Sequence, residues 1–153
     1  MIQFARGCPE IAALETRSVA VGQGPRLPGD EYAFIEFYCD ESACDCRRVF
    51  FQVIPRSQPE VVLASINFGW EEEGFYRKRM PYDADAPTNI TRGSLDPLNE
   101  QSDYATELLE LFQRFVLDVP YRLRLRRHYK LFKHRLEHAS KRRSGFRNDE
   151  SVR

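Results

Sequence analysis

Three of the four cysteines in this 153-residue chain lie close together, as Cys39, Cys44 and Cys46. Their spacing is C-x4-C-x-C, and the residues between them are mostly turn formers. Thiolates are soft ligands, and a tetrahedral zinc ion takes several of them at about 2.3 Å. The cluster therefore predicts a metal site, with zinc as the expected cofactor. A disulfide or redox pair within the cluster is the second interpretation, and three unrelated buried thiols are the third.

The fourth ligand stays open among His128, Cys8 and a water molecule. His128 lies on the apolar line of a predicted helix, where its ring must find a partner, and imidazole is a good zinc ligand. A core histidine bonded to a carbonyl or a carboxylate explains it equally well. Cys8 would complete the site if the N-terminal turn packs under the cluster. The predicted metal ligands are Cys39, Cys44, Cys46 and His128.

His134 and His138 are the remaining histidines. They are four residues apart, so they can share a helix face and bind one ion. Lys133, Arg135 and Lys141 stand around them, and this positive charge opposes a cation. The pair is therefore not included in the predicted site.

The elements that position the thiols are two apolar runs within 32–54. In the first run two sets of side chains alternate with the period of a strand, Tyr32, Phe34, Glu36 and Tyr38 against Ala33, Ile35, Phe37 and Cys39. The second run, 48–54, is dense in Val, Phe and Ile. The pattern predicts a hairpin whose kinked tip turns the cysteines toward one another.

Further strands are expected over 16–21 and 60–70, which makes a small antiparallel meander. The segment 81–97 contains three prolines and is expected to be irregular. Apolar residues recur at spacings of three and four residues along 99–117 and 120–139, which predicts two helices. Asp118 is the expected cap of the second helix. The fold class is therefore predicted as α+β, a β-meander packed against a C-terminal antiparallel helix pair.

The domain organisation is expected to be one domain over 1–139, followed by a basic, disordered tail over 140–153. From Tyr121 onward the chain has 12 Lys and Arg residues and only 3 Asp and Glu residues, a net charge of +9, although the whole chain is neutral. This asymmetry is typical of a basic arm that contacts nucleic acid, or of two halves that neutralise each other. A protein partner is also possible, and a membrane partner is not expected because the chain has no long apolar run.

No secretion signal is recognisable, so a soluble, cytoplasmic protein is expected. In that reducing compartment a compact cysteine cluster is more often metal-binding or redox-active than a structural disulfide. The absence of G-x-S-x-G and of other catalytic patterns leaves no catalytic residue assigned, and enzymatic activity stays uncertain.

Three motifs, EFYC-x4-CDCRRV at 36–49, FGWE at 68–71 and RHY at 127–129, carry a resemblance. On these residues the chain resembles a family of small prokaryotic proteins of uncharacterised function, which implies no activity. The expected function is a small interaction or binding module with a structural zinc ion. The alternatives are a thiol-redox or metal-dependent enzyme that uses the same cysteines, and a nucleic-acid-binding protein that uses the basic C-terminal helix.

Overall fold

Buried and partly exposed side chains alternate along the two central strands, so one face of each strand lies in the core. In the computed structural model, which describes the backbone of residues 1–149 and the side chains of 1–139, β3 (Asp30–Tyr38) pairs antiparallel with β4 (Arg48–Pro55). The predicted hairpin over 32–54 is thus confirmed. Its buried face carries Tyr32, Phe34, Glu36, Tyr38, Val49, Phe51 and Val53.

Within the described part of the chain, six antiparallel strands form one sheet in the order β1-β3-β4-β5-β6, and β2 pairs with β3 beside β1. The expected strands over 16–21 and 60–70 correspond to β2 and β5. The strands outside the hairpin are β1 (Ile2–Gln3), β2 (Arg17–Val21), β5 (Ala64–Gly69) and β6 (Ser94–Leu95). The predicted mixture of helix and antiparallel sheet is therefore confirmed.

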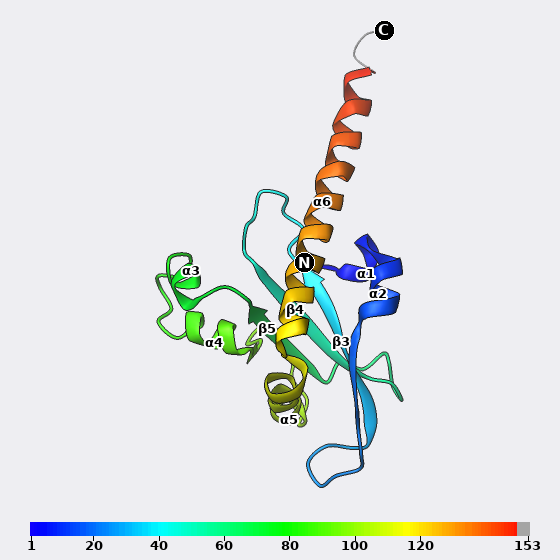
Figure 1. Cartoon of the computed structure of the whole chain (residues 1–153), viewed down its shortest axis with the longest axis vertical. Coiled ribbons are helices and arrows are strands. Elements are labelled where there is room, and N and C mark those ends of the chain that lie inside the picture. Colours follow the sequence, from blue (N-terminus) through cyan, green and yellow to red (C-terminus); the bar gives the residue numbers. More distant parts are fainter. Residues whose placement is uncertain (150–153) are drawn as a thin grey trace.

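Short helices flank the sheet (Figure 1). They are α1 (Phe4–Gly7), α2 (Pro9–Glu15), α3 (Glu73–Arg77) and α4 (Ala86–Arg92). The prediction that 81–97 is irregular was wrong, because this segment contains α4 and β6. Pro87 lies in the first turn of α4, where a helix needs no N–H donor, and Gly93 ends the helix with φ +85°.

The C-terminal region is α5 (Ala105–Leu111), a π-helical turn over Phe112–Val116, and α6 (Val119–Asp149). In Figure 1 α6 crosses the sheet and projects beyond it, whereas α5 is seen nearly end-on. The expected antiparallel helix pair is therefore not confirmed. The backbone stays helical beyond the predicted end at 139, and 150–153, the rest of the expected disordered tail, lie outside the described residues. None of the helices that the structure describes is long and apolar enough to cross a bilayer.

Asp118 caps the first turn of α6, as expected. Its Oδ1 accepts a 2.7 Å hydrogen bond from the backbone N–H of Tyr121. We expect Asp118→Ala to lower the free energy of unfolding by about 1 kcal/mol, the usual cost of losing a cap. Urea denaturation followed by circular dichroism measures this loss. Asp118→Asn is the control, because it keeps a capping oxygen and should retain most of the stability; equal losses in both variants would attribute the effect to the ion pair with Arg17 instead.

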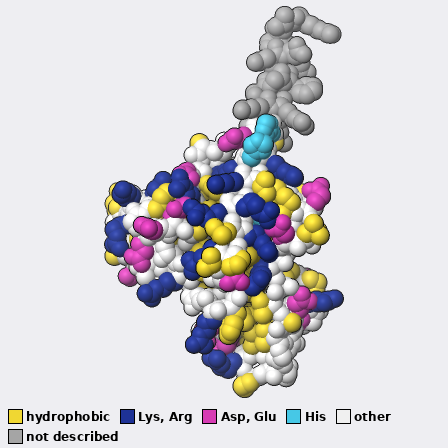
Figure 2. Space-filling view, in the orientation of Figure 1, with side chains coloured by type: hydrophobic (Ala, Val, Ile, Leu, Met, Phe, Trp, Pro, Cys, Tyr) yellow, Lys and Arg dark blue, Asp and Glu magenta, His cyan; other side chains and the backbone are white. Residues whose placement is uncertain are grey.

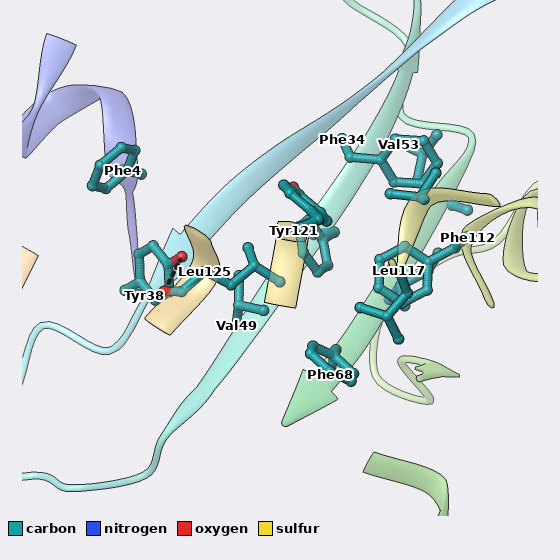
Figure 3. Close-up of a cluster of buried hydrophobic side chains, with 14 of the residues drawn as sticks. Phe4, Phe34, Tyr38, Val49, Val53, Phe68, Phe112, Leu117, Tyr121 and Leu125 are labelled. Carbon is teal, nitrogen blue, oxygen red and sulfur yellow. Dashed lines mark hydrogen bonds between the residues drawn. The ribbon is translucent and has the colours of Figure 1, made fainter. Parts of the chain in front are cut away.

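Aromatic side chains fill the space between the sheet and the C-terminal helices (Figure 3). The ring of Phe112 lies 5.8 Å from that of Phe34, 5.1 Å from Phe51 and 6.0 Å from Phe68, measured between centroids. Tyr121 and Leu125 continue this core along α6. The first two turns of α6 are thereby held against the sheet by packing.

Candidate metal centre

The three clustered cysteines meet in the loop that joins β3 to β4, at the tip of the hairpin. Cys39 directly follows β3, and Cys44 and Cys46 lie in the last residues before β4. Their sulfur atoms all lie within 4.8 Å of one another, and each residue is partly buried. All four cysteines of the chain are free thiols. The structure therefore brings together three of the predicted site residues, and this group could hold a metal ion.

The loop reaches this arrangement through two local features. A backbone hydrogen bond of 3.1 Å from the N–H of Cys44 to the carbonyl oxygen of Glu41 closes a turn within it. Arg47 adopts a left-handed conformation with φ +47°, which is uncommon for a residue with a side chain. This local kink falls between Cys46 and the start of β4, where the sequence predicted an irregular hairpin end.

Side-chain contacts hold Arg47 in this conformation. Its Nε donates a 2.8 Å hydrogen bond to Asp45, its guanidinium lies 4.8 Å from the ring centre of Phe75, and Tyr76 donates a 2.6 Å bond to its carbonyl oxygen. The hydrogen bond from Arg47 lowers the pKa of Asp45 below its ordinary value. The kink is therefore stabilised from both the loop and α3.

We expect Tyr76→Phe to destabilise the protein by about 1 kcal/mol, since it keeps the ring but removes the bond from its hydroxyl to the Arg47 carbonyl oxygen and the weaker one that the hydroxyl accepts from the N–H of Glu71. Thermal unfolding of the two proteins measures the difference. The control is Tyr82→Phe, because Tyr82 is fully exposed and should change nothing. Unchanged stability in Tyr76→Phe would show that the Arg47 conformation does not depend on this bond.

Helix α6 supports the loop from the other side. The hydroxyl of Tyr129 donates a 3.2 Å hydrogen bond to the carbonyl oxygen of Cys44, and Lys133 Nζ donates one of 2.6 Å to that of Glu41. Burial raises the pKa of Tyr129 to about 12, and the charge of nearby Cys46 adds to the rise. The phenol thus stays a hydrogen-bond donor to the cysteine loop across the physiological pH range.

The dimensions of the cluster suit a metal ion. With zinc–sulfur bonds of about 2.3 Å, two thiolates in a tetrahedral site lie about 3.8 Å apart. The observed limit of 4.8 Å is larger by about one ångström, which side-chain rotation can close. The donor set is three soft sulfurs, which favours zinc or another thiophilic metal over magnesium or calcium.

His128, the predicted fourth ligand, lies outside the thiol group. Only 1% of its surface is exposed, and its two nitrogens face carboxylates, Nδ1 at 2.7 Å from Glu36 and Nε2 at 3.0 Å from Glu15. Phe4 stacks on the ring at 4.3 Å. Both nitrogens are engaged, so this arrangement does not support the metal role of His128. One residue further along α6, Tyr129 faces the cysteine loop instead.

Cys8 is also separate from the cluster. It lies at the junction of α1 and α2, fully buried among core residues, and burial raises the pKa of its thiol. His134 and His138 are exposed on α6. Within the part of the chain whose side chains are described, the group that could hold an ion consists of thiols alone.

Glu36, for which the sequence predicted no role, lies at the centre of a buried polar network. Its carboxylate accepts hydrogen bonds from Tyr38 at 2.8 Å and Tyr121 at 3.1 Å, besides its contact with His128. Burial raises the pKa of both tyrosines well above the ordinary value, and the charge of Glu36 raises it further. The sequence signal that could have revealed this network is a carboxylate on the aromatic face of β3, because a buried acid needs hydrogen-bond partners.

The network continues to the surface through Glu15. A hydrogen bond from Arg127 lowers the pKa of Glu15, and burial opposes this effect in part. Arg124 lies 3.5 Å from the same carboxylate. Three segments, α2, β3 and α6, are thereby joined through His128, which explains a core histidine without a metal.

No protein-family model matches the chain, and neither the curated proteins nor the solved structures include a significant match. The resemblance to small prokaryotic proteins stays a prediction. The feature of this protein that points to a function is therefore the geometry of its cysteine cluster.

Proposed function

We propose that this protein is a small binding or interaction module whose fold is completed by one zinc ion held by Cys39, Cys44 and Cys46. The observation that supports this proposal is the convergence of the three sulfur atoms within 4.8 Å. Three soft donors from one loop suit a thiophilic ion, and binding such an ion contributes to folding free energy.

A structural role for the ion follows from what the loop contacts. The loop is bonded to α6 through Tyr129 and Lys133, and to the β5–α3 region through the pair of Arg47 with Glu71 at 3.5 Å. An ion that fixes the loop therefore also fixes these contacts. Three thiolates and a divalent cation carry a net negative charge, and Lys133 brings a positive charge to the same loop through its bond to Glu41. In this proposal water or a donor from a partner fills the fourth position.

Elemental analysis of the purified protein, together with thiol counting before and after chelation, tests the proposal. We expect one zinc ion per chain, and three thiols that become reactive only after chelation. Cys8→Ala is the matched control and should keep the full zinc content. If Cys8→Ala loses the metal and Cys44→Ser keeps it, the site is not the one proposed.

A thiol-redox or metal-dependent enzyme at the same cluster is the second candidate, and the free state of the closely spaced thiols favours it. The same measurements separate the two. Purified protein without metal, in which oxidation reversibly joins two of the three cysteines, would support a redox enzyme. One bound zinc and masked thiols support the structural module.

The contacts of the arginines on α6 argue against nucleic-acid binding through this helix. Arg126 pairs with Glu71, Arg127 and Arg124 pair with Glu15, and the Arg122 guanidinium lies 5.2 Å from the ring centre of Phe68. These contacts point to neutralisation within the protein. Affinity for DNA or RNA that falls steeply with added salt would instead support a nucleic-acid surface.

A further inference from the structure

A second group of metal-ligating side chains lies on α6, where it leaves the body of the protein. His134 and His138 are exposed, and their Nε2 atoms are 3.0 Å apart. Their ring centroids are 4.3 Å apart, with the planes at 66°. Figure 2 shows histidine side chains gathered at the surface beside this helix. The two side chains are neighbours because residues four apart share one face of a helix.

The separation of the two nitrogens matches bidentate chelation. With metal–nitrogen bonds of about 2.0–2.1 Å, two imidazoles in adjacent square or tetrahedral positions have their nitrogens about 2.8–3.4 Å apart. The observed 3.0 Å lies within this range. In the metal-free pair one Nε2 donates its hydrogen to the other. In the chelate the donor ring carries its proton on Nδ1 instead, after exchange through solvent, so that both rings direct an Nε2 lone pair at the ion.

Two positive residues next to the pair, Lys133 and Arg135, are directed away from it. Lys133 Nζ bonds the carbonyl oxygen of Glu41 at 2.6 Å, on the side of the cysteine loop. Arg135 bonds the carbonyl oxygen of Gly7 and lies 4.0 Å from Glu10, on the side of α1 and α2. The charges of Lys133 and Arg135, two of the three that argued against a cation in the sequence, are thus turned toward the protein body on either side of the pair.

We propose that His134 and His138 form a second metal site, independent of the cysteines, that binds a late first-row divalent cation through both Nε2 atoms. Imidazole suits zinc, nickel and copper, and the general order of affinity puts copper first. Solvent fills the remaining coordination positions, so the site is an open one on the surface of α6.

Titration calorimetry with Ni2+ tests this proposal, in a protein that carries Cys39→Ser, Cys44→Ser and Cys46→Ser. We expect one Ni2+ per chain, and an affinity that falls about tenfold to a hundredfold when either histidine becomes glutamine, because linked ligands bind far more tightly than separate ones. The same titration on the zinc-loaded wild-type chain should give the same Ni2+ step, so the result does not depend on the serine substitutions.

A relocated pair is the control for spacing. Lys130 is exposed one turn before His134, so Lys130→His combined with His138→Gln restores two histidines four residues apart. This variant should recover the affinity that His138→Gln loses. Equal Ni2+ affinity in the parent and in both glutamine variants would overturn the proposal, as would failure of the relocated pair. Because the cysteines are absent from these proteins, neither result bears on the zinc module.

Discussion

Chelation of zinc is expected to lower the melting temperature of this protein by about 8–16 °C. A ligand present at a thousandfold excess over its dissociation constant stabilises the folded state by about 4 kcal/mol. In a chain of this length each kcal/mol corresponds to about 2–4 °C. The effect arises because Cys39, Cys44 and Cys46 converge only in the folded hairpin, so the unfolded chain cannot hold the ion with all three thiolates. Thermal unfolding with and without a chelator measures it.

Two cysteine variants make this prediction specific to the cluster. Cys44→Ser should melt at the lower temperature already, and a chelator should shift it no further. Cys8→Ala should stay sensitive to the chelator, because Cys8 lies in the core at the α1–α2 junction. A chelator effect of the same size in Cys44→Ser and the wild-type protein would place the stabilising ion elsewhere.

Replacing Glu36 with alanine is expected to destabilise the protein by about 3–5 kcal/mol, the cost of removing one partner from a buried charged group. The carboxylate is 5% exposed and accepts hydrogen bonds from Tyr38 and Tyr121 while it contacts His128. Tyr121 and His128 would each keep a buried polar atom without its partner, and the hydroxyl of Tyr38 would be left with only its longer bond of 3.3 Å to the carbonyl oxygen of Leu125. Denaturant unfolding followed by fluorescence and circular dichroism gives the free energy.

Glu31→Ala is the matched control, because Glu31 lies on the same strand and pairs with Arg56 at 2.8 Å. Arg56 is largely exposed, so this surface pair should contribute little to stability. Comparable losses in the two variants would mean that the Glu36 network is no more important than a surface ion pair. A third variant, Glu36→Gln, keeps an acceptor for the tyrosines, so its loss of stability should lie between those of Glu31→Ala and Glu36→Ala.

Much of the framework follows from local patterns. The alternation over 32–39 predicted β3 and its two faces, and Asp118 with Pro120 predicted the start of α6. The C-x4-C-x-C spacing between two strands predicted that the thiols would meet, because antiparallel pairing brings the ends of adjacent strands together. The structure of segment 81–97 was harder to predict, since prolines are compatible with both a loop and the first turn of a helix.

The amino-acid sequence by itself determined the cysteine-tipped hairpin, the apolar lines of the helices and the basic C-terminal helix, because each depends on neighbours within a few residues. Only the tertiary structure decided that His128 faces Glu36 and Glu15, and that Tyr129 faces the cysteine loop. Periodicity places a side chain on the buried face of a helix. Which residue that side chain contacts depends on the crossing angle of the helix and on its position along the sheet. That crossing is set by long-range packing of residues such as Phe112 and Tyr121 against β4, which no local pattern contains.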